Sequence, residues 1–272
     1  MLIQRPDIFP LCSPPPLRNR VTSTNTHPQD DYFLTSGDKI RYFFEEDAVS
    51  PTTGTLTKPK HLAVNKIGHY LHGLSAPFAS LLSPTADIKA RPAAVAQVLG
   101  FSDPRCLQSM VILKQPEIGG AVPPHQDSTF LYTNPPSAVG FWYALEDATL
   151  ENGCLSFLPG SHRWAGIEQR LVRKEGGGTE MVANSEGAKF PRGLGEEGGR
   201  EEKGKGEYVP GEVKAGSLVL IHGNLLHKSE RNTSKKGRII YTFHIIEGGE
   251  GFVYDERNWL QPPAEGFTRL YP

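Results

Sequence analysis

Pro123-Pro124-His125-Gln126-Asp127 is the stretch of sequence that most constrains the fold, because it predicts an extended segment with two polar side chains on one face. Two successive prolines exclude a helix and favour an extended backbone. In an extended chain, residues i and i+2 point to the same side, so His125 and Asp127 face the same way. The segment can therefore present an imidazole nitrogen and a carboxylate oxygen to one metal ion.

Short segments with β character lie on both sides of this stretch. They are rich in β-branched and aromatic residues, and they span residues 39–44, 107–114, 138–146, 154–158, 216–222 and 238–247. Asn152-Gly153 predicts a tight hairpin turn between two of them. Strands separated by Gly- and Pro-containing loops favour a sandwich or jelly roll over a parallel α/β sheet, so we predict a mainly β fold.

Other regions differ in composition. Apolar spacing predicts helices over residues 61–82 and 85–100. Residues 1–30 are rich in Pro, Ser, Thr and Asn and lack an apolar period, which predicts a disordered tail. We expect residues 31–272 to form a single domain, in which the Gly- and Glu-rich stretch 173–207 is a flexible, solvated insertion.

The charge of the chain argues against a large charged partner. Its 29 basic and 30 acidic residues give a formal net charge of -1, which disfavours nucleic acid and anionic membranes as partners. The start of the chain lacks the basic head and apolar run of a secretory signal. The three cysteines are odd in number and not closely spaced, which indicates reduced thiols in an intracellular protein. We therefore expect a cytoplasmic monomer that acts on a small molecule; a loose N-terminal match to a peroxisomal address leaves that compartment open.

A His-x-Asp triplet occurs often by chance, so a metal site needs a third ligand and further support. His227 follows a strand-like segment late in the chain, and Arg238 begins the next one. Two imidazoles and one carboxylate on one face of an octahedron leave three positions open, which suits non-haem iron(II). The guanidinium of Arg238 can bind a carboxylate with two parallel hydrogen bonds, as the far carboxylate of 2-oxoglutarate requires.

Three other histidines compete for the place of third ligand. We rank His227 first, His222 second and His244 third; His227 ranks above His222 because of the family resemblance described below, since His222 lies too far before Arg238 for the family pattern. His244 shares strand parity with Arg238 and is interpreted as a hydrogen-bonded core residue that faces the same interior. His162 follows Pro-Gly-Ser and is interpreted as stabilising a turn near the mouth of the site.

Several motifs in this order are familiar from one family. They are Tyr32–Ile40, Asn65–His69, Gln108–Met110, Pro124–Asp127, Glu146–Cys154, Pro159–His162, Leu220–Gly223, His227–Ser229, Tyr241–His244 and Asn258–Pro262. From about Asp31 to its C-terminus, the chain resembles the phytanoyl-CoA dioxygenase superfamily. The resemblance implies a double-stranded β-helix core, which is a cupin-like jelly roll, with flanking α-helices.

The same resemblance implies a function and a set of site residues. It implies Fe(2+) held by His125, Asp127 and His227. It implies a 2-oxoglutarate pocket that includes Lys66, Met110, Gln126, Trp142, Ser229 and Arg238. The expected cofactors are Fe(2+), 2-oxoglutarate and O2, with ascorbate as a reductant.

The expected reaction is hydroxylation of a small or acyl-type substrate, with release of succinate and CO2. A carboxylate at Asp127 favours hydroxylation, since related iron halogenases carry a small residue there. The alternative from another class is a non-catalytic jelly-roll binding module that retains the metal site. The first 30 residues and the 173–207 stretch depart from the family pattern.

Overall fold

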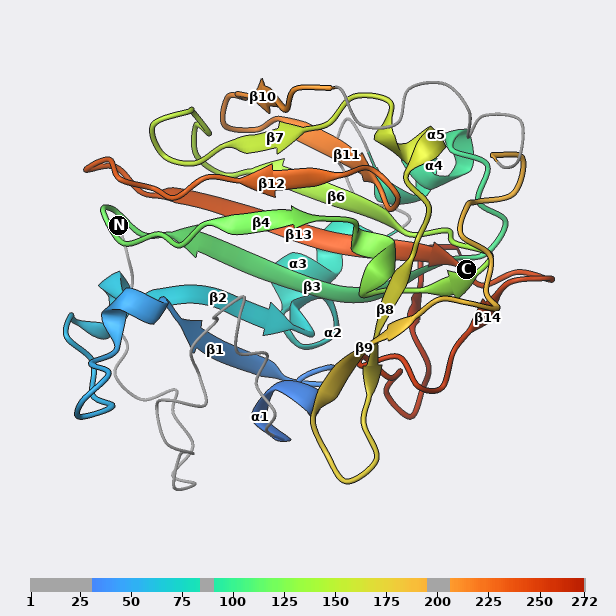
Figure 1. Cartoon of the computed structure of the whole chain (residues 1–272), viewed down its shortest axis with the longest axis horizontal. Helices are drawn as coiled ribbons and strands as arrows, with labels where there is room; N and C mark the ends of the chain where they lie inside the picture. Colours follow the sequence, from blue (N-terminus) through green and yellow to red (C-terminus); the bar gives the residue numbers. More distant parts are fainter. Residues whose placement is uncertain (1–30, 84–90, 195–205, 272) are drawn as a thin grey trace.

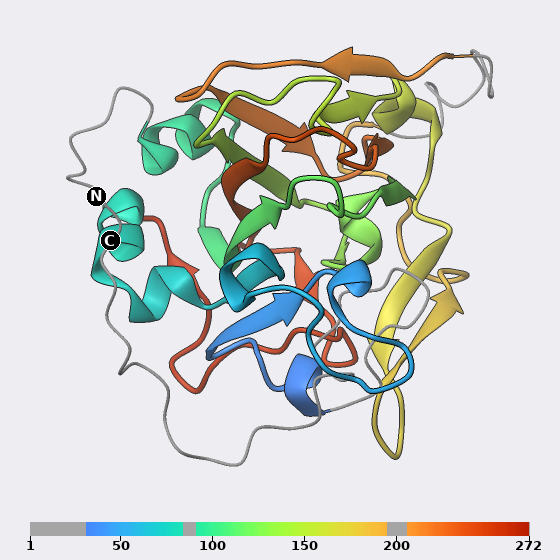
Figure 2. The same cartoon turned by 90° about the vertical axis from the view of Figure 1, so that its left-hand side faces the viewer.

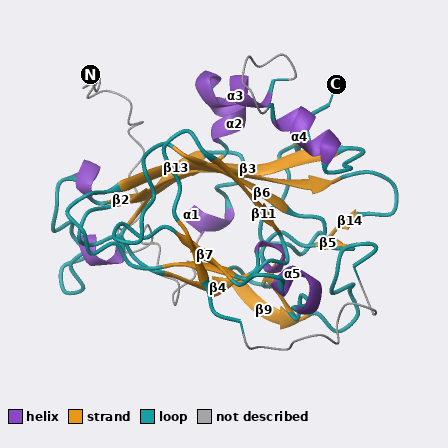
Figure 3. Cartoon of the chain, turned by 90° about the horizontal axis from the view of Figure 1, so that it is seen from above, coloured by secondary structure: helices purple, strands orange, loops and turns teal. Residues whose placement is uncertain are grey.

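Two β-sheets face each other in the computed structural model, which describes residues 31–83, 91–194 and 206–271 (Figure 3). The larger sheet has the strand order β1-β2-β3-β13-β6-β11, with β15 also paired to β3. The smaller sheet has the order β10-β7-β12-β4. All the pairings in these sheets are antiparallel, so the predicted mainly β jelly roll is confirmed.

The bounds of the elements follow. The strands are β1 Ile40–Phe44, β2 Val64–His69, β3 Pro104–Lys114, β4 Val122–His125, β5 Thr133–Asn134, β6 Val139–Ala144, β7 Leu155–Phe157, β8 Gln169–Arg173, β9 Thr179–Ala183, β10 Val209–Gly211, β11 Leu218–His222, β12 His227–Ser229, β13 Arg238–Glu247, β14 Val253–Tyr254 and β15 Thr268–Arg269. The helices are α1 Asp31–Leu34, α2 Leu71–Leu74, α3 Ala76–Leu82, α4 Pro92–Val98 and α5 Ser161–Trp164, with 3-10 turns η2 Glu46–Ala48, η3 Lys60–Leu62 and η4 Asp127–Thr129.

Strand β13 lies near the centre of the large sheet, and its alternate side chains face the helices on one side and the cavity on the other. Tyr241, Phe243 and Ile245 point outward, into a core cluster that also holds residues of α2, α3 and α4. Figure 3 shows these helices on the outer side of the sheet. The alternate residues Thr242 and His244 point to the inside, where they line the cavity described below. A strand with a mainly apolar outer face and a mixed inner face therefore separates the core from the site.

Strand β4 carries the Pro123-Pro124 pair at the edge of the small sheet, where a missing backbone N–H costs no ladder bond. It pairs with β12 in a register that places His227 opposite His125. The chain then turns into η4, which begins at Asp127. Proline chemistry at an edge strand thus fixes the place of two site residues.

Two predictions about local structure were wrong. The predicted helix over 61–82 holds strand β2 in its first half, because residues 64–69 pair with β1 and residues 66–69 also pair with β3. Its second half is helical, as α2 and α3. Asn152-Gly153 does not join two paired strands, since β6 and β7 belong to different sheets. The predicted helix over 85–100 is confirmed for Pro92–Val98, and the left-handed φ of +85° at Gly100 follows its end.

The stretch 173–207 was predicted to be a solvated loop, but it contains strand β9, which pairs with β8 as a two-stranded hairpin. Figure 2 shows this hairpin (yellow) on the opposite side of the molecule from the teal helices α2–α4, and Figure 1 shows it crossing beside the sheets. Residues 195–205 and the predicted tail, 1–30, lie outside the described residues. None of the described helices is long and apolar enough to cross a membrane.

Candidate metal centre

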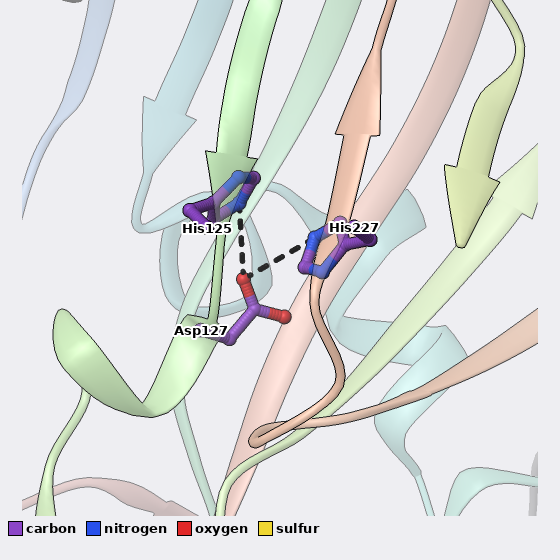
Figure 4. Close-up of side chains that lie close together, drawn as sticks. All are labelled: His125, Asp127 and His227. Carbon is purple, nitrogen blue, oxygen red and sulfur yellow. Dashed lines mark ion pairs between the residues drawn. The ribbon is translucent and has the colours of Figure 1, made fainter. Parts of the chain in front are cut away.

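His125, Asp127 and His227 converge at one end of the space between the sheets (Figure 4). One potential ligand atom from each lies within 4.8 Å of the other two. Asp127 Oδ1 is 3.5 Å from His125 Nε2 and 3.7 Å from His227 Nε2. Each histidine also directs its Nδ1 at a carbonyl, that of Pro123 for His125 and that of Leu225 for His227. With Nδ1 donating to these carbonyls, Nε2 is the free nitrogen, as a metal ligand requires.

The electrostatics of the triad suit a divalent cation. Burial raises the pKa of Asp127, but the three imidazoles of His227, His244 and His125 outweigh it and hold that pKa well below its usual value. Burial is also the main influence on His227, and it lowers the pKa of this imidazole. Burial also acts to lower the pKa of His125, but the hydrogen bond and charge of Asp127 outweigh it and raise that pKa. A metal ion at this site would bind the neutral form of both imidazoles beside the charged carboxylate.

A further layer of side chains supports Asp127 from the large sheet. His244 on β13 places its Nε2 at 3.3 Å from Asp127 Oδ2. Its Nδ1 lies 3.5 Å from the side-chain nitrogen of Gln108 on β3. Gly140 leaves room for this pair, because a Cβ there would lie 3.3 Å from His244 Nε2 and 3.4 Å from Asp127 Oδ2. The sequence interpretation of His244 as an interior residue near the site is consistent with this position, and His244 contacts a triad member rather than joining the triad.

A cavity of about 430 Å³ opens from the triad along the inner face of the large sheet. Five of the six predicted cosubstrate contacts line it together with the triad, and these are Lys66, Met110, Trp142, Ser229 and Arg238. Strand pairing explains why some of these residues lie together. Thr242 on β13 pairs with Met110 on β3 on one side and with Trp142 on β6 on the other, so all three side chains point to the same inner face. The structure therefore brings together residues that are far apart in the chain.

Arg238 is a cation that lines the cavity at the start of β13, six residues before His244, which contacts Asp127, so it lies at the far end of the strand from the triad. Its side chain is buried, and Nη2 donates to the carbonyl of Gly153 at 3.0 Å, with Ser229 Oγ at 3.4 Å. The guanidinium carbon lies 5.3 Å from the centre of the Trp142 ring. Nε of Arg238 is buried and has no hydrogen-bond partner among the residues that the structure describes. A buried cation with an unused donor in a cavity is suited to bind an anion.

Gln126 is the one predicted contact that does not line the cavity. Its amide nitrogen donates to the carbonyls of Ala165 at 2.7 Å and Asn224 at 2.8 Å, so the side chain joins the loops around η4. The prediction that Gln126 binds the cosubstrate has no support in this geometry. The side chain instead fixes the segment that joins His125 to Asp127.

His222 and His162 lie together, away from the triad. Their rings are 5.1 Å apart, and His222 Nδ1 accepts a hydrogen bond from the backbone N–H of Asn224 at 3.0 Å. Neither residue lines the cavity. The ranking of His227 above His222 as the third ligand agrees with this arrangement.

The sequence interpretation missed three charged residues that line the cavity, Lys114, Glu45 and Lys228, the last of which is ion-paired with Glu230 at 2.6 Å. Lys114 is the last residue of β3 and is paired with Arg238 in the neighbouring strand. Its position was open to prediction, because it shares strand parity with Met110. Glu45 follows β1 and accepts a hydrogen bond from the backbone N–H of Gly120 at 3.1 Å. No sequence motif distinguishes Glu45 from the acidic residues beside it.

Comparison with known proteins gives a consistent family likeness. The sequence profile of the family described as phytanoyl-CoA dioxygenase (PhyH) matches residues 16–240. The match begins inside the segment predicted to be a tail, so the likeness extends further than the Asp31 start predicted from the motifs. A phytanoyl-CoA dioxygenase domain-containing protein 1 from Bos taurus is 47% identical over 243 residues, which cover 89% of this chain and 77% of that protein. A phytanoyl-CoA dioxygenase from Arabidopsis thaliana is 40% identical over 240 residues, 88% of this chain and 76% of that protein.

A solved structure supports the fold. The epimerase SnoN, in complex with Fe3+, alpha ketoglutarate and nogalamycin RO, aligns with a TM-score of 0.51 and 19% identity. The alignment covers 76% of this chain and 79% of that one. At this identity the likeness concerns the architecture of the two sheets and not the chemistry.

Proposed function

The chain belongs to the phytanoyl-CoA dioxygenase family, and from that membership we propose that it is an iron(II)- and 2-oxoglutarate-dependent dioxygenase. One observation carries the proposal. A single cavity has a triad of two histidines and one carboxylate at one end and a buried arginine with an unused donor at the other. A molecule that chelates a metal with one end and carries a carboxylate at the other suits both ends. The SnoN complex contains such a molecule, alpha ketoglutarate, together with Fe3+.

The residues present fit the proposed metal. His125 and His227 offer imidazole nitrogens, and Asp127 adds the charge that a divalent ion needs. In this family of sites, bound iron and 2-oxoglutarate supply oxidative decarboxylation to succinate and CO2, coupled to oxidation of a substrate. The chain's own part is to hold the metal, orient the cosubstrate and restrict water.

The other predicted contacts have separate tasks in this proposal. Arg238 binds the far carboxylate of 2-oxoglutarate, while Met110 and Trp142 contact its methylene groups. Lys66 lines the same cavity, and burial lowers the pKa of its ammonium to about 8. This ammonium adds positive charge that favours a dianion.

The substrate in this proposal is a small or acyl-type molecule. One wall of the cavity is apolar, with aromatic and aliphatic residues Phe33, Phe130, Leu131, Leu171 and Trp259. The Phe33 and Trp259 rings are stacked with centres 4.4 Å apart. Such a wall favours an apolar body, which would lie beside the metal while the charged groups of the cavity hold the cosubstrate.

Succinate formation tests the proposal directly. Purified protein with iron(II), ascorbate, oxygen and 2-oxoglutarate should form succinate slowly, even without its substrate. The Asp127→Ala variant, with its iron content measured, should form none. Wild-type protein that binds iron and 2-oxoglutarate yet forms no succinate would favour the alternative, a jelly-roll binding module that retains the metal site.

A further inference from the structure

Lys114 is a buried cation at the same end of the cavity as Arg238. The two residues are cross-strand partners at the adjoining ends of β3 and β13. Both are about 3% exposed, and both line the cavity. Two buried cations in neighbouring strands repel each other unless an anion lies between them.

The two cations contact the same hydroxyl group. Lys114 Nζ donates to Ser229 Oγ at 2.6 Å, and Arg238 Nη2 lies 3.4 Å from the same oxygen. The Ser229 hydroxyl donates in turn to the carbonyl of Gly153 at 2.8 Å. The single hydroxyl proton of Ser229 is therefore engaged by the carbonyl of Gly153. Lys114 and Arg238 are left as the groups that can donate hydrogen bonds to a bound anion here.

Gly153 is required for this close arrangement. Its φ is +77°, and a Cβ there would lie 2.8 Å from Lys114 Cδ and 3.0 Å from Lys114 Nζ. The glycine lets the backbone carbonyl approach both Ser229 and Arg238. The Asn152-Gly153 pair, which does not form a hairpin, thus contributes to the cationic end of the cavity.

The charge of Lys114 is only partly balanced by protein groups. Its ammonium has three protons, and its described acceptors are Ser229 Oγ and the carbonyl of Glu230. Burial, with a further contribution from the charge of Arg238, lowers the pKa of Lys114 to about 7. Glu45 is the carboxyl other than Asp127 among the described residues that line the cavity, and burial raises its pKa, which weakens it as a counter-ion. Glu230, the other acidic neighbour of Lys114, is ion-paired with Lys228 at 2.6 Å.

We propose that Lys114 is a further cosubstrate-binding cation, which contacts the distal carboxylate of 2-oxoglutarate together with Arg238. This inference rests on the proposed function. It assigns the carboxylate two positively charged donors, a guanidinium from β13 and an ammonium from β3. Ser229 then acts as the hydroxyl that holds the two cations in place.

The test compares two ligands that differ only in the distal carboxylate. 2-Oxoglutarate and 2-oxopentanoate chelate a metal in the same way, but the second carries a methyl group in place of the carboxylate. Both are titrated by calorimetry, without oxygen, into iron(II)-loaded wild type, Lys114→Gln and Lys114→Met. Glutamine keeps two hydrogen-bond donors and removes the charge, so it preserves contacts that the fold requires. Lys214→Met is the matched control, because it removes an exposed lysine that is paired with Asp147 outside the cavity.

We expect Lys114→Gln to weaken 2-oxoglutarate binding about tenfold, the effect of one charged hydrogen bond. Binding of 2-oxopentanoate should stay within about twofold in the same variant, as should both ligands in Lys214→Met. An equal loss for both ligands, or a loss in Lys114→Met alone, would overturn the inference and make Lys114 a structural residue. Wild type that binds neither ligand would instead contradict the proposed function, and the inference with it.

Discussion

The two ends of the cavity are opposite in charge. At the triad end, one carboxylate is surrounded by imidazoles, three of which hold the pKa of Asp127 low. At the other end, Arg238 and Lys114 contact one hydroxyl, and burial lowers the pKa of both cations, to about 10 and about 7. The first end therefore presents a charged carboxylate and imidazoles to a metal ion, and the second presents two cations to an anion.

The difference shows how buried charge indicates a ligand. A protein that did not bind ions could fill both ends with apolar side chains at little cost or with a gain in stability. The cationic end here instead keeps charges that the described protein groups do not fully balance. Three substitutions and one change of pH should separate the two ends, from the largest expected effect to the smallest.

Asp127→Ala should damage the triad end most. It removes the only negative charge among the three ligand groups, so iron(II) affinity should fall by more than about 100-fold, beyond the range typical of supporting residues. Calorimetric titration with iron(II) under anaerobic conditions measures this. If this variant bound iron(II) as tightly as wild type, Asp127 would not be a metal ligand.

His244→Leu should weaken the same end less. His244 supports Asp127 from the large sheet at 3.3 Å, and loss of a group that orients a ligand lowers metal affinity about 10–100-fold. His244→Gln, which keeps a donor, should recover part of this loss. Equal losses in the two variants would show that packing, and not orientation of the carboxylate, explains the effect.

Arg238→Lys should act only on the cationic end. Lysine keeps the charge but loses the two-pronged geometry, so 2-oxoglutarate affinity should fall about tenfold or more. Iron(II) affinity should remain that of wild type. Parallel titrations with both ligands check this, and a change in iron affinity alone would show that the two ends are not separate.

The pH dependence of binding should be the smallest effect. Burial lowers the pKa of Lys114 to about 7 and of Lys66 to about 8, so both lose charge as pH rises through these values, and an anion binds the charged forms better. The charged neighbours of Lys114 are Arg238, Glu45 and Glu230, and the pKa of Arg238, at about 10, lies above this range. Affinity for 2-oxoglutarate should therefore fall with rising pH, by at most about tenfold per pH unit for each lysine.

2-Oxopentanoate is the control for this pH series. It lacks the distal carboxylate, so its affinity should lack that part of the pH dependence that arises at the cationic end. If both ligands show the same profile, the titrating groups belong to the triad end instead.

The strands and the triad were predictable because their signals are local. Residues 238–247 form a run of β-branched and aromatic side chains, and β13 spans the same residues. Pro123-Pro124 excludes a helix wherever it lies, so the shared orientation of His125 and Asp127 followed from the chain itself. The choice of His227 over His222 needed the family pattern in addition.

The wrong predictions concern residues whose structure depends on distant partners. Val64 and Ile67 have helical spacing, but strand pairing with β1 and β3 decides the conformation. Asn152-Gly153 has the sequence of a hairpin turn, but no hairpin forms. The carbonyl of Gly153 instead accepts hydrogen bonds from Ser229 and Arg238, which lie far away in the sequence. The contact between Lys114 and Ser229 joins β3 to β12 and has no signature in either segment.

The coupling between the two ends tests the account most directly. 2-Oxoglutarate is titrated by calorimetry into metal-free and iron(II)-loaded wild-type protein, without oxygen. If one molecule spans the cavity, iron should strengthen its binding about tenfold or more, and 2-oxoglutarate should strengthen iron binding by the same factor. Equal affinities with and without iron would contradict the account, because the carboxylate would then bind at a place that the metal does not reach.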